Sequence, residues 1–113
     1  MSELTVRELV AIAHTTAVEQ GWWEEGRRNV GELIALMHSE LSEALEEWRT
    51  QGTSVTDVNW ATGAPSGFGV ELADCVIRIA DCCGQLGIDL SHLLEVKMAY
   101  NKTRPYRHGD KLA

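Results

Sequence analysis

The chain has 113 residues, of which 44% are hydrophobic and 24% charged, a composition typical of a single soluble globular domain. No apolar run approaches the roughly 18–20 residues that span a membrane, and the first residues lack the pattern of a secretory signal, so we expect a cytoplasmic protein without membrane contact. Residues 1–96 carry a net charge of −11 and residues 97–113 a net charge of +4. The acidic body argues against binding to nucleic acid, whose phosphates it would repel.

Hydrophobic periodicity predicts four helices and no convincing strand. The first helix is expected to begin after Thr5, where residues 5–8 (TVRE) fit a capping box, and to end near Gly21. The second is expected over about residues 29–50, with Trp48 in its apolar stripe and therefore in the core. Residues 51–69 contain four glycines and one proline without a regular period, so we expect a long loop there.

The third helix, expected over about residues 70–86, is apolar around most of its circumference. Such a helix lies at the centre of a bundle or is covered by another subunit, and Gly84 and Gly87 are expected to end it. The fourth is expected to begin at Asp89 or Ser91 and to end at about residue 103, before an irregular basic tail over 105–113. These elements predict one all-α domain over residues 1–113, a subunit that resembles a four-helix bundle.

Two pairs of acidic residues have the same spacing in the second and third predicted helices. Glu40 and Glu43 are three residues apart, as are Glu71 and Asp74, so each pair projects from adjacent turns of its helix. Four carboxylates brought together would repel one another, and a hard divalent cation removes that conflict. All-oxygen ligation favours Mg²⁺, with Mn²⁺ as a substitute, over zinc. The alternative interpretation is a solvated acidic helix face.

The fourth predicted helix places polar side chains in register with its apolar stripe, at Lys97, Asn101 and Arg104. Burying an unpaired cation is costly, so we expect these residues to meet carboxylates or a bound anion. The alternative is an ordinary basic helix end, favoured by the helix dipole. His108 and Lys111, in the basic tail, are further candidates for substrate binding.

Several segments together resemble MazG-like all-α NTP pyrophosphohydrolases. Residues 39–44 (SELSEA) and 71–74 (ELAD) resemble the E-x-x-E…E-x-x-D signature of that family. Residues 20–23 (QGWW) and 97–109 (KMAYNKTRPYRHG) resemble the segments before the first metal helix and at the C-terminus in its dCTP pyrophosphatase branch. The resemblance covers most of the chain. Many members have E-E-x-x-E, whereas Ser39 stands at the first position here, so a base assigned to that glutamate does not transfer.

The resemblance implies hydrolysis of (deoxy)nucleoside triphosphates to the monophosphate and pyrophosphate, as a house-cleaning activity on the nucleotide pool. It implies that the four acidic residues bind Mg²⁺, that the polar residues of the fourth helix hold the triphosphate, and that Trp22 or Trp23 lines the base pocket. Burial of both tryptophans in a core or an interface is the alternative. It further implies a homodimer, or a homotetramer built from dimers.

The mechanistic hypothesis is attack of an activated water on the α-phosphorus, with Glu40 or Glu43 as general base. Two other functions use the same residues differently. One is a phosphoribosyl-ATP-type pyrophosphohydrolase, and the other is a non-catalytic helical dimerisation module whose carboxylates are only solvated.

Overall fold

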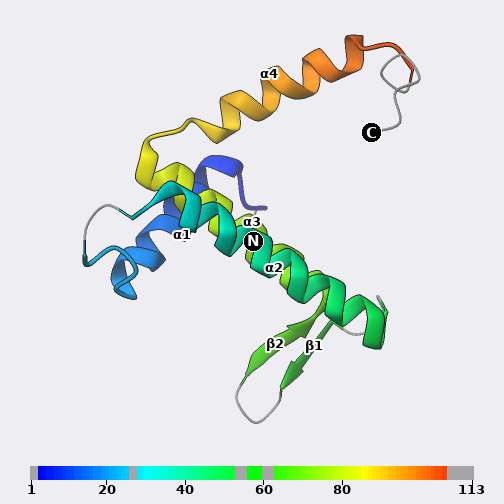
Figure 1. Cartoon of the computed structure of the whole chain (residues 1–113). Helices are drawn as coiled ribbons and strands as arrows, with labels where there is room; N and C mark the ends of the chain where they lie inside the picture. The colour runs from blue at the N-terminus through cyan, green and yellow to red at the C-terminus, as the bar shows by residue number, and fades with distance from the viewer. Residues whose placement is uncertain (1–2, 26–27, 53–55, 60–62, 107–113) are drawn as a thin grey trace.

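The computed structural model of the chain describes residues 3–25, 28–52, 56–59 and 63–106, most of which are helical. The described elements are, in chain order, α1 (Val6–Glu19), α2 (Val30–Gln51), β1 (Thr56–Asn59), β2 (Ala64–Gly67), α3 (Phe68–Leu86) and α4 (Leu90–Thr103) (Figure 1). This confirms the prediction of an all-α protein. No helix among the described residues combines the length and the apolar character that a membrane crossing requires.

The helix ends follow the local sequence. At α1 the Glu8 amide donates to Thr5 Oγ1 and the Thr5 amide donates to Glu8 Oε1, both over 3.1 Å, so the predicted capping box is confirmed. Asp89 caps α4 by accepting from the His92 amide over 3.2 Å. Gly87 ends α3 in the left-handed conformation, with φ 69°, which glycine adopts without the steric cost of a Cβ.

The core lies along α3, which packs against α1 on one side and α2 on the other. Its buried apolar residues are mostly small, which lets the helices approach closely: Ala13, Leu33, Ala44, Cys75, Ala80, Cys82 and Cys83. The central position predicted for the third helix is therefore confirmed. All three cysteines are free and buried.

Gly84 lies inside α3 and does not end it, so the predicted role of this residue is wrong. A Cβ at Gly84 would lie only 2.6 Å from the Cβ of His14 on α1. Glycine is needed here because the backbones of α1 and α3 come too close for a side chain at this position. Packing between helices, which the local sequence does not encode, explains the difference.

The segment expected to be a long loop contains an antiparallel hairpin of β1 and β2, in which Val58 is opposite Pro65 and Thr56 is opposite Gly67. The prediction of no strand is wrong at this point. Proline is compatible with a two-stranded hairpin because both strands are edges. The prediction that Trp48 is a core residue is wrong, because this side chain is 51% exposed. Its ring lies 5.8 Å from the ring of Phe68, measured between centroids.

The helix α4 extends away from α2 and α3, and Figure 1 shows it as an arm (yellow to orange) above the other three helices. Its packing contacts are with α1, where Arg7 Nη1 donates to Asp89 Oδ1 over 3.0 Å. Within one chain, α1, α2 and α3 therefore form the packed body of the protein, and α4 is joined to it at α1. Large apolar side chains on α4 remain exposed: Leu93, Leu94, Val96, Met98 and Tyr100.

Candidate metal centre and adjoining pocket

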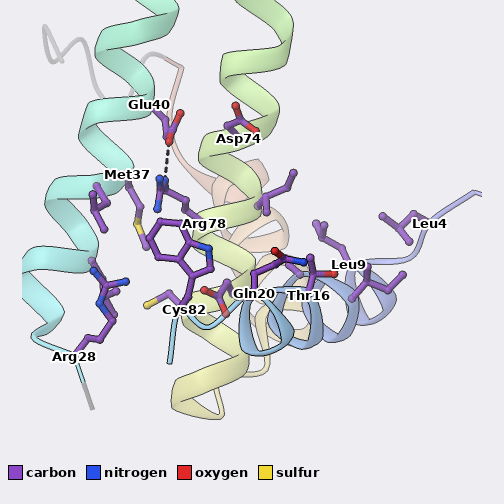
Figure 2. A pocket seen from close by; sticks show the side chains of 18 residues that line it. Leu4, Leu9, Thr16, Gln20, Arg28, Met37, Glu40, Asp74, Arg78 and Cys82 are labelled. Atoms are coloured by element: carbon purple, nitrogen blue, oxygen red, sulfur yellow. Dashed lines mark hydrogen bonds and ion pairs between the residues drawn. The ribbon is translucent and has the colours of Figure 1, made fainter. Parts of the chain in front are cut away.

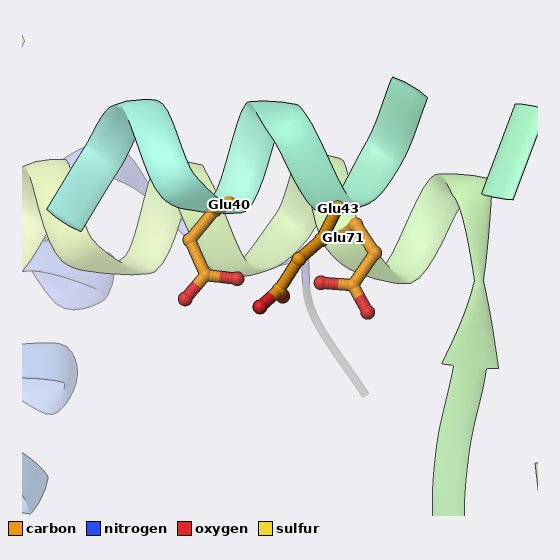
Figure 3. Close-up of side chains that lie close together, drawn as sticks. All are labelled: Glu40, Glu43 and Glu71. Carbon is orange, nitrogen blue, oxygen red and sulfur yellow. The ribbon is translucent and has the colours of Figure 1, made fainter. Parts of the chain in front are cut away.

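Three of the four predicted acidic ligands converge between α2 and α3. Glu40 and Glu43 project from adjacent turns of α2, and Glu71 projects from the first turn of α3, one turn after the hairpin (Figure 3). One carboxylate oxygen from each residue lies within 4.8 Å of the others. We call these three residues the carboxylate cluster. Carboxylates from two helices at this separation can ligate one hard cation.

Burial makes this cluster electrostatically unfavourable without a cation. Glu40 is only 7% exposed, and Oε2 of Glu71 is buried without a hydrogen-bond partner among the described residues. Burial raises the pKa of Glu71 to about 7, and a hydrogen bond with Glu43 and the charges of Glu43, Asp74 and Glu40 act in the same direction. An unsatisfied buried carboxylate oxygen is what a divalent cation would satisfy, so the donor set fits Mg²⁺ or Mn²⁺.

Asp74 lies one turn further along α3 than Glu71 and is not part of the closest group of three. Burial raises the pKa of Asp74, the charge of Glu40 raises it further, and the nearby Arg78 lowers it. Figure 2 shows its carboxylate on α3 across from Glu40 on α2. Asp74 therefore adjoins the carboxylate cluster, on the side where the pocket begins.

A pocket of about 540 Å³ adjoins the cluster and is lined by side chains from α1, α2, α3 and the segment between α1 and α2. Glu40 and Asp74 form its acidic end, and Met37 and Ile77 contribute apolar wall (Figure 2). This volume is in the range of about 300–1,000 Å³ found for small-molecule sites. A mostly apolar cavity that ends in carboxylates can take an aromatic ring at one end and a cation-bound anion at the other.

The two neighbouring tryptophans have different positions. Trp22 lines the pocket and is 49% exposed, whereas Trp23 is half-buried and donates from Nε1 to Asp81 Oδ1 over 3.0 Å. His14 Nδ1 lies 2.9 Å from the same oxygen. Of the two candidates for a base-lining aromatic, only Trp22 faces the pocket, and Trp23 belongs to a polar network between α1 and α3.

Sequence reasoning missed Arg78, which lies at the centre of this site. Its Nε donates to Glu40 Oε1 over 2.7 Å, and its guanidinium carbon lies 5.4 Å from the Trp22 ring centroid. A signal existed, because Arg78 follows Asp74 by four residues and Glu71 by seven and so shares their helix face. Helical spacing places Arg78 on the face of α3 that carries Glu71 and Asp74, but only the packing of α2 against α3 pairs it with Glu40.

The predicted phosphate-binding residues of α4 do not line the pocket within one chain. Lys97 Nζ lies 5.0 Å from the ring centroid of Tyr100 on the same helix, and Asn101 is exposed. Arg104 caps the end of α4 and is half-buried. His108 and Lys111 lie outside the described residues.

Comparison with protein-family models, curated proteins and solved structures found no match to this chain.

Proposed function

We propose that the chain is a Mg²⁺-dependent nucleoside triphosphate pyrophosphohydrolase of the MazG-like kind, which converts a (deoxy)nucleoside triphosphate and water into the monophosphate and pyrophosphate. The observation that supports this proposal is the carboxylate cluster, in which a buried Glu71 oxygen has no hydrogen-bond partner in the described part of the chain, next to a pocket lined by Glu40, Asp74 and Trp22. The resemblance of residues 39–44 and 71–74 to the family signature points to the same reaction.

The proposed metal ligands are Glu40, Glu43 and Glu71, with Asp74 beside them. When bound, Mg²⁺ would lower the pKa of a water molecule and neutralise phosphate charge, and Mn²⁺ would serve as a substitute. Without a cation these four carboxylates would repel a polyphosphate, so metal and substrate are expected to bind together.

The chain's own side chains would carry the proton and orient the substrate. The water oxygen forms a bond to the α-phosphorus, the bond from that phosphorus to the α–β bridging oxygen breaks, and pyrophosphate leaves with the electron pair. Glu40 or Glu43 accepts the proton of the attacking water. Trp22 lines the pocket beside Arg78, where its ring would contact the base of the nucleotide.

We further propose that the active form is a homodimer, or a tetramer built from dimers, in which α4 completes a four-helix arrangement. In addition to the apolar residues of α4, one side of α2 exposes Ile34, Leu41, Leu45 and Trp48 at helical spacing. Apolar surface of this extent on a small domain is typical of an interface. Assembly would also bring Lys97, Asn101 and Arg104 toward carboxylates or phosphates, as their pattern predicts.

The direct test is a screen of the common NTPs, dNTPs and phosphoribosyl-ATP with Mg²⁺, measuring pyrophosphate and orthophosphate separately. We expect pyrophosphate from one or more nucleoside triphosphates, and Glu43→Gln should lower the rate at least about 100-fold, because it removes a metal-ligand charge. Glu46→Gln is the matched control, since Glu46 is exposed on the same helix and outside the cluster.

Preferential turnover of phosphoribosyl-ATP would instead indicate a phosphoribosyl-ATP-type pyrophosphohydrolase. A chain that releases no pyrophosphate and whose melting temperature does not change with Mg²⁺ would be a non-catalytic helical module. Full activity of Glu43→Gln would exclude the carboxylate cluster as the metal site.

A further inference from the structure

Among the described residues, Arg78 is anchored through one of its three guanidinium nitrogens. Nε donates to Glu40 Oε1 over 2.7 Å, and neither terminal nitrogen donates to any residue in the described part of the chain. The side chain is 30% exposed and lies over the Trp22 ring, which restricts its movement. An arginine held at Nε presents its two terminal NH₂ groups as a fixed pair of donors, the geometry that binds two oxygens of one phosphate.

Two cationic side chains line the pocket among the described residues, Arg28 and Arg78. Arg28 pairs with the exposed Glu32 on α2, whereas Arg78 pairs with Glu40, a member of the carboxylate cluster. A polyphosphate that approaches the cluster from the pocket side therefore meets Arg78.

We propose that Arg78 is a substrate-binding residue whose terminal NH₂ groups bind a phosphate group of the nucleotide, and that Glu40 positions it through Nε. This inference rests on the proposed function, because it requires a polyphosphate between the carboxylate cluster and the pocket. It places a phosphate-binding cation on α3 of the same chain, in addition to those predicted on α4. Arg78 thereby connects the carboxylate cluster to Trp22.

The test uses inorganic tripolyphosphate as a probe that is independent of the base, and isothermal titration calorimetry as the readout. Mg²⁺ alone is titrated first, and tripolyphosphate is then titrated at saturating Mg²⁺. The variants are Arg78→Gln, which removes the charge, and Arg78→Lys, which keeps the charge but cannot bond Glu40 and present a paired donor at once. Arg49→Gln is the matched control, because Arg49 is an exposed arginine on α2 outside the pocket.

We expect Arg78→Gln to weaken tripolyphosphate binding at least about 10-fold, Arg78→Lys several-fold and Arg49→Gln less than twofold, as expected for loss of a charge-assisted hydrogen bond. Mg²⁺ binding should be retained in all three. Circular dichroism checks that each variant is folded. If Arg78→Gln does not fold, the tripolyphosphate affinity of Arg78→Lys tests the inference instead.

Tripolyphosphate binding within twofold of wild type in Arg78→Lys and Arg78→Gln would overturn the inference while leaving the proposed function intact. Loss of Mg²⁺ binding together with tripolyphosphate binding would also overturn it, because Arg78 would then act only by holding Glu40. A wild-type chain that binds neither Mg²⁺ nor tripolyphosphate would overturn the proposed function itself.

Discussion

At the scale of single residues, Glu71 shows most clearly that the carboxylate cluster is arranged for something other than stability. One of its oxygens is buried without a hydrogen-bond partner among the described residues, and burial together with neighbouring acids raises the pKa of Glu71 to about 7. A surface glutamate at a helix start would instead be solvated and stabilised by the helix dipole. The folded chain therefore holds Glu71 in an environment that opposes its ionisation.

This environment predicts a pH-dependent cost of folding. Because the pKa of Glu71 is higher in the folded protein than its ordinary value of 4.5, the folded state retains a proton that the unfolded state has released between about pH 4.5 and pH 7. The contribution of Glu71 to stability is therefore fully present below about pH 4.5 and is lost as the pH rises through about 7. With EDTA present, Glu71→Gln should be more stable than wild type at pH 8 and nearly equal to it at pH 4.5, as measured by urea unfolding.

Mg²⁺ should reverse the order of stability at pH 8, so that wild type becomes more stable than Glu71→Gln. At pH 8, where the cluster is ionised, the cation is expected to stabilise wild type by roughly 1–3 kcal/mol at saturating concentration and to leave Glu71→Gln almost unchanged. Glu46→Gln should behave as wild type in both media. Equal stabilisation of Glu71→Gln by Mg²⁺ would show that Glu71 is not a ligand.

At the scale of secondary-structure elements, the contact between α1 and α3 sets the position of the polar residues at the base of the pocket. Gly84 allows α1 to lie directly against α3, and His14 on α1 then reaches Asp81 on α3 over 2.9 Å. The same carboxylate oxygen accepts from Trp23. One glycine thus fixes the spacing on which this network depends.

Gly84→Ala should therefore destabilise the protein even though alanine is the better helix former. The helix propensity gained is about 1 kcal/mol, whereas overpacking at a contact that leaves 2.6 Å between two Cβ atoms costs about 1–3 kcal/mol. We expect a net loss of up to about 2 kcal/mol in urea unfolding. Gln85→Ala, at the exposed neighbouring position, is the control and should be neutral or slightly stabilising. A stabilised Gly84→Ala variant would show that the helices can separate freely.

At the scale of the whole molecule, the chain is more extended than a closed domain of its length. Its radius of gyration is 16.7 Å, compared with about 13 Å for a compact domain of 100 residues. Both α4 and the hairpin of β1 and β2 project from the three packed helices and contribute to this difference (Figure 1). A helix of 14 residues with five exposed large apolar side chains is expected to pack against another surface.

The apolar residues of α2 and α4 should therefore mediate self-association. Size-exclusion chromatography with light scattering is expected to give a dimer or tetramer for wild type, and Leu45→Asp should shift it toward the monomer, because burying an unpaired carboxylate at an interface is unfavourable. Glu46→Gln should leave the assembly unchanged. A monomeric wild-type chain at micromolar concentration would contradict the proposed assembly.

The sequence by itself determined the helices and the identity of the acidic residues. Periodicity, capping residues and glycines are local signals, so the capping box at Thr5, the central α3 and the spacing of Glu40, Glu43 and Glu71 could all be read from the chain. The family resemblance supported the same residues. Local signals gave wrong predictions where the structure depends on contacts between segments. Examples are the pairing of β1 with β2 and the contact of Gly84 with His14 on α1.

Only the tertiary structure decided which residues meet. The pairing of Arg78 with Glu40, the separation of Trp22 from Trp23 and the exposure of Trp48 all depend on the angle and distance at which α3 crosses its neighbours. The position of α4 away from the carboxylate cluster likewise depends on which apolar surface it can cover. Helical spacing fixes which side chains share a face, but contacts between faces are non-local and cannot be read from local patterns in the sequence.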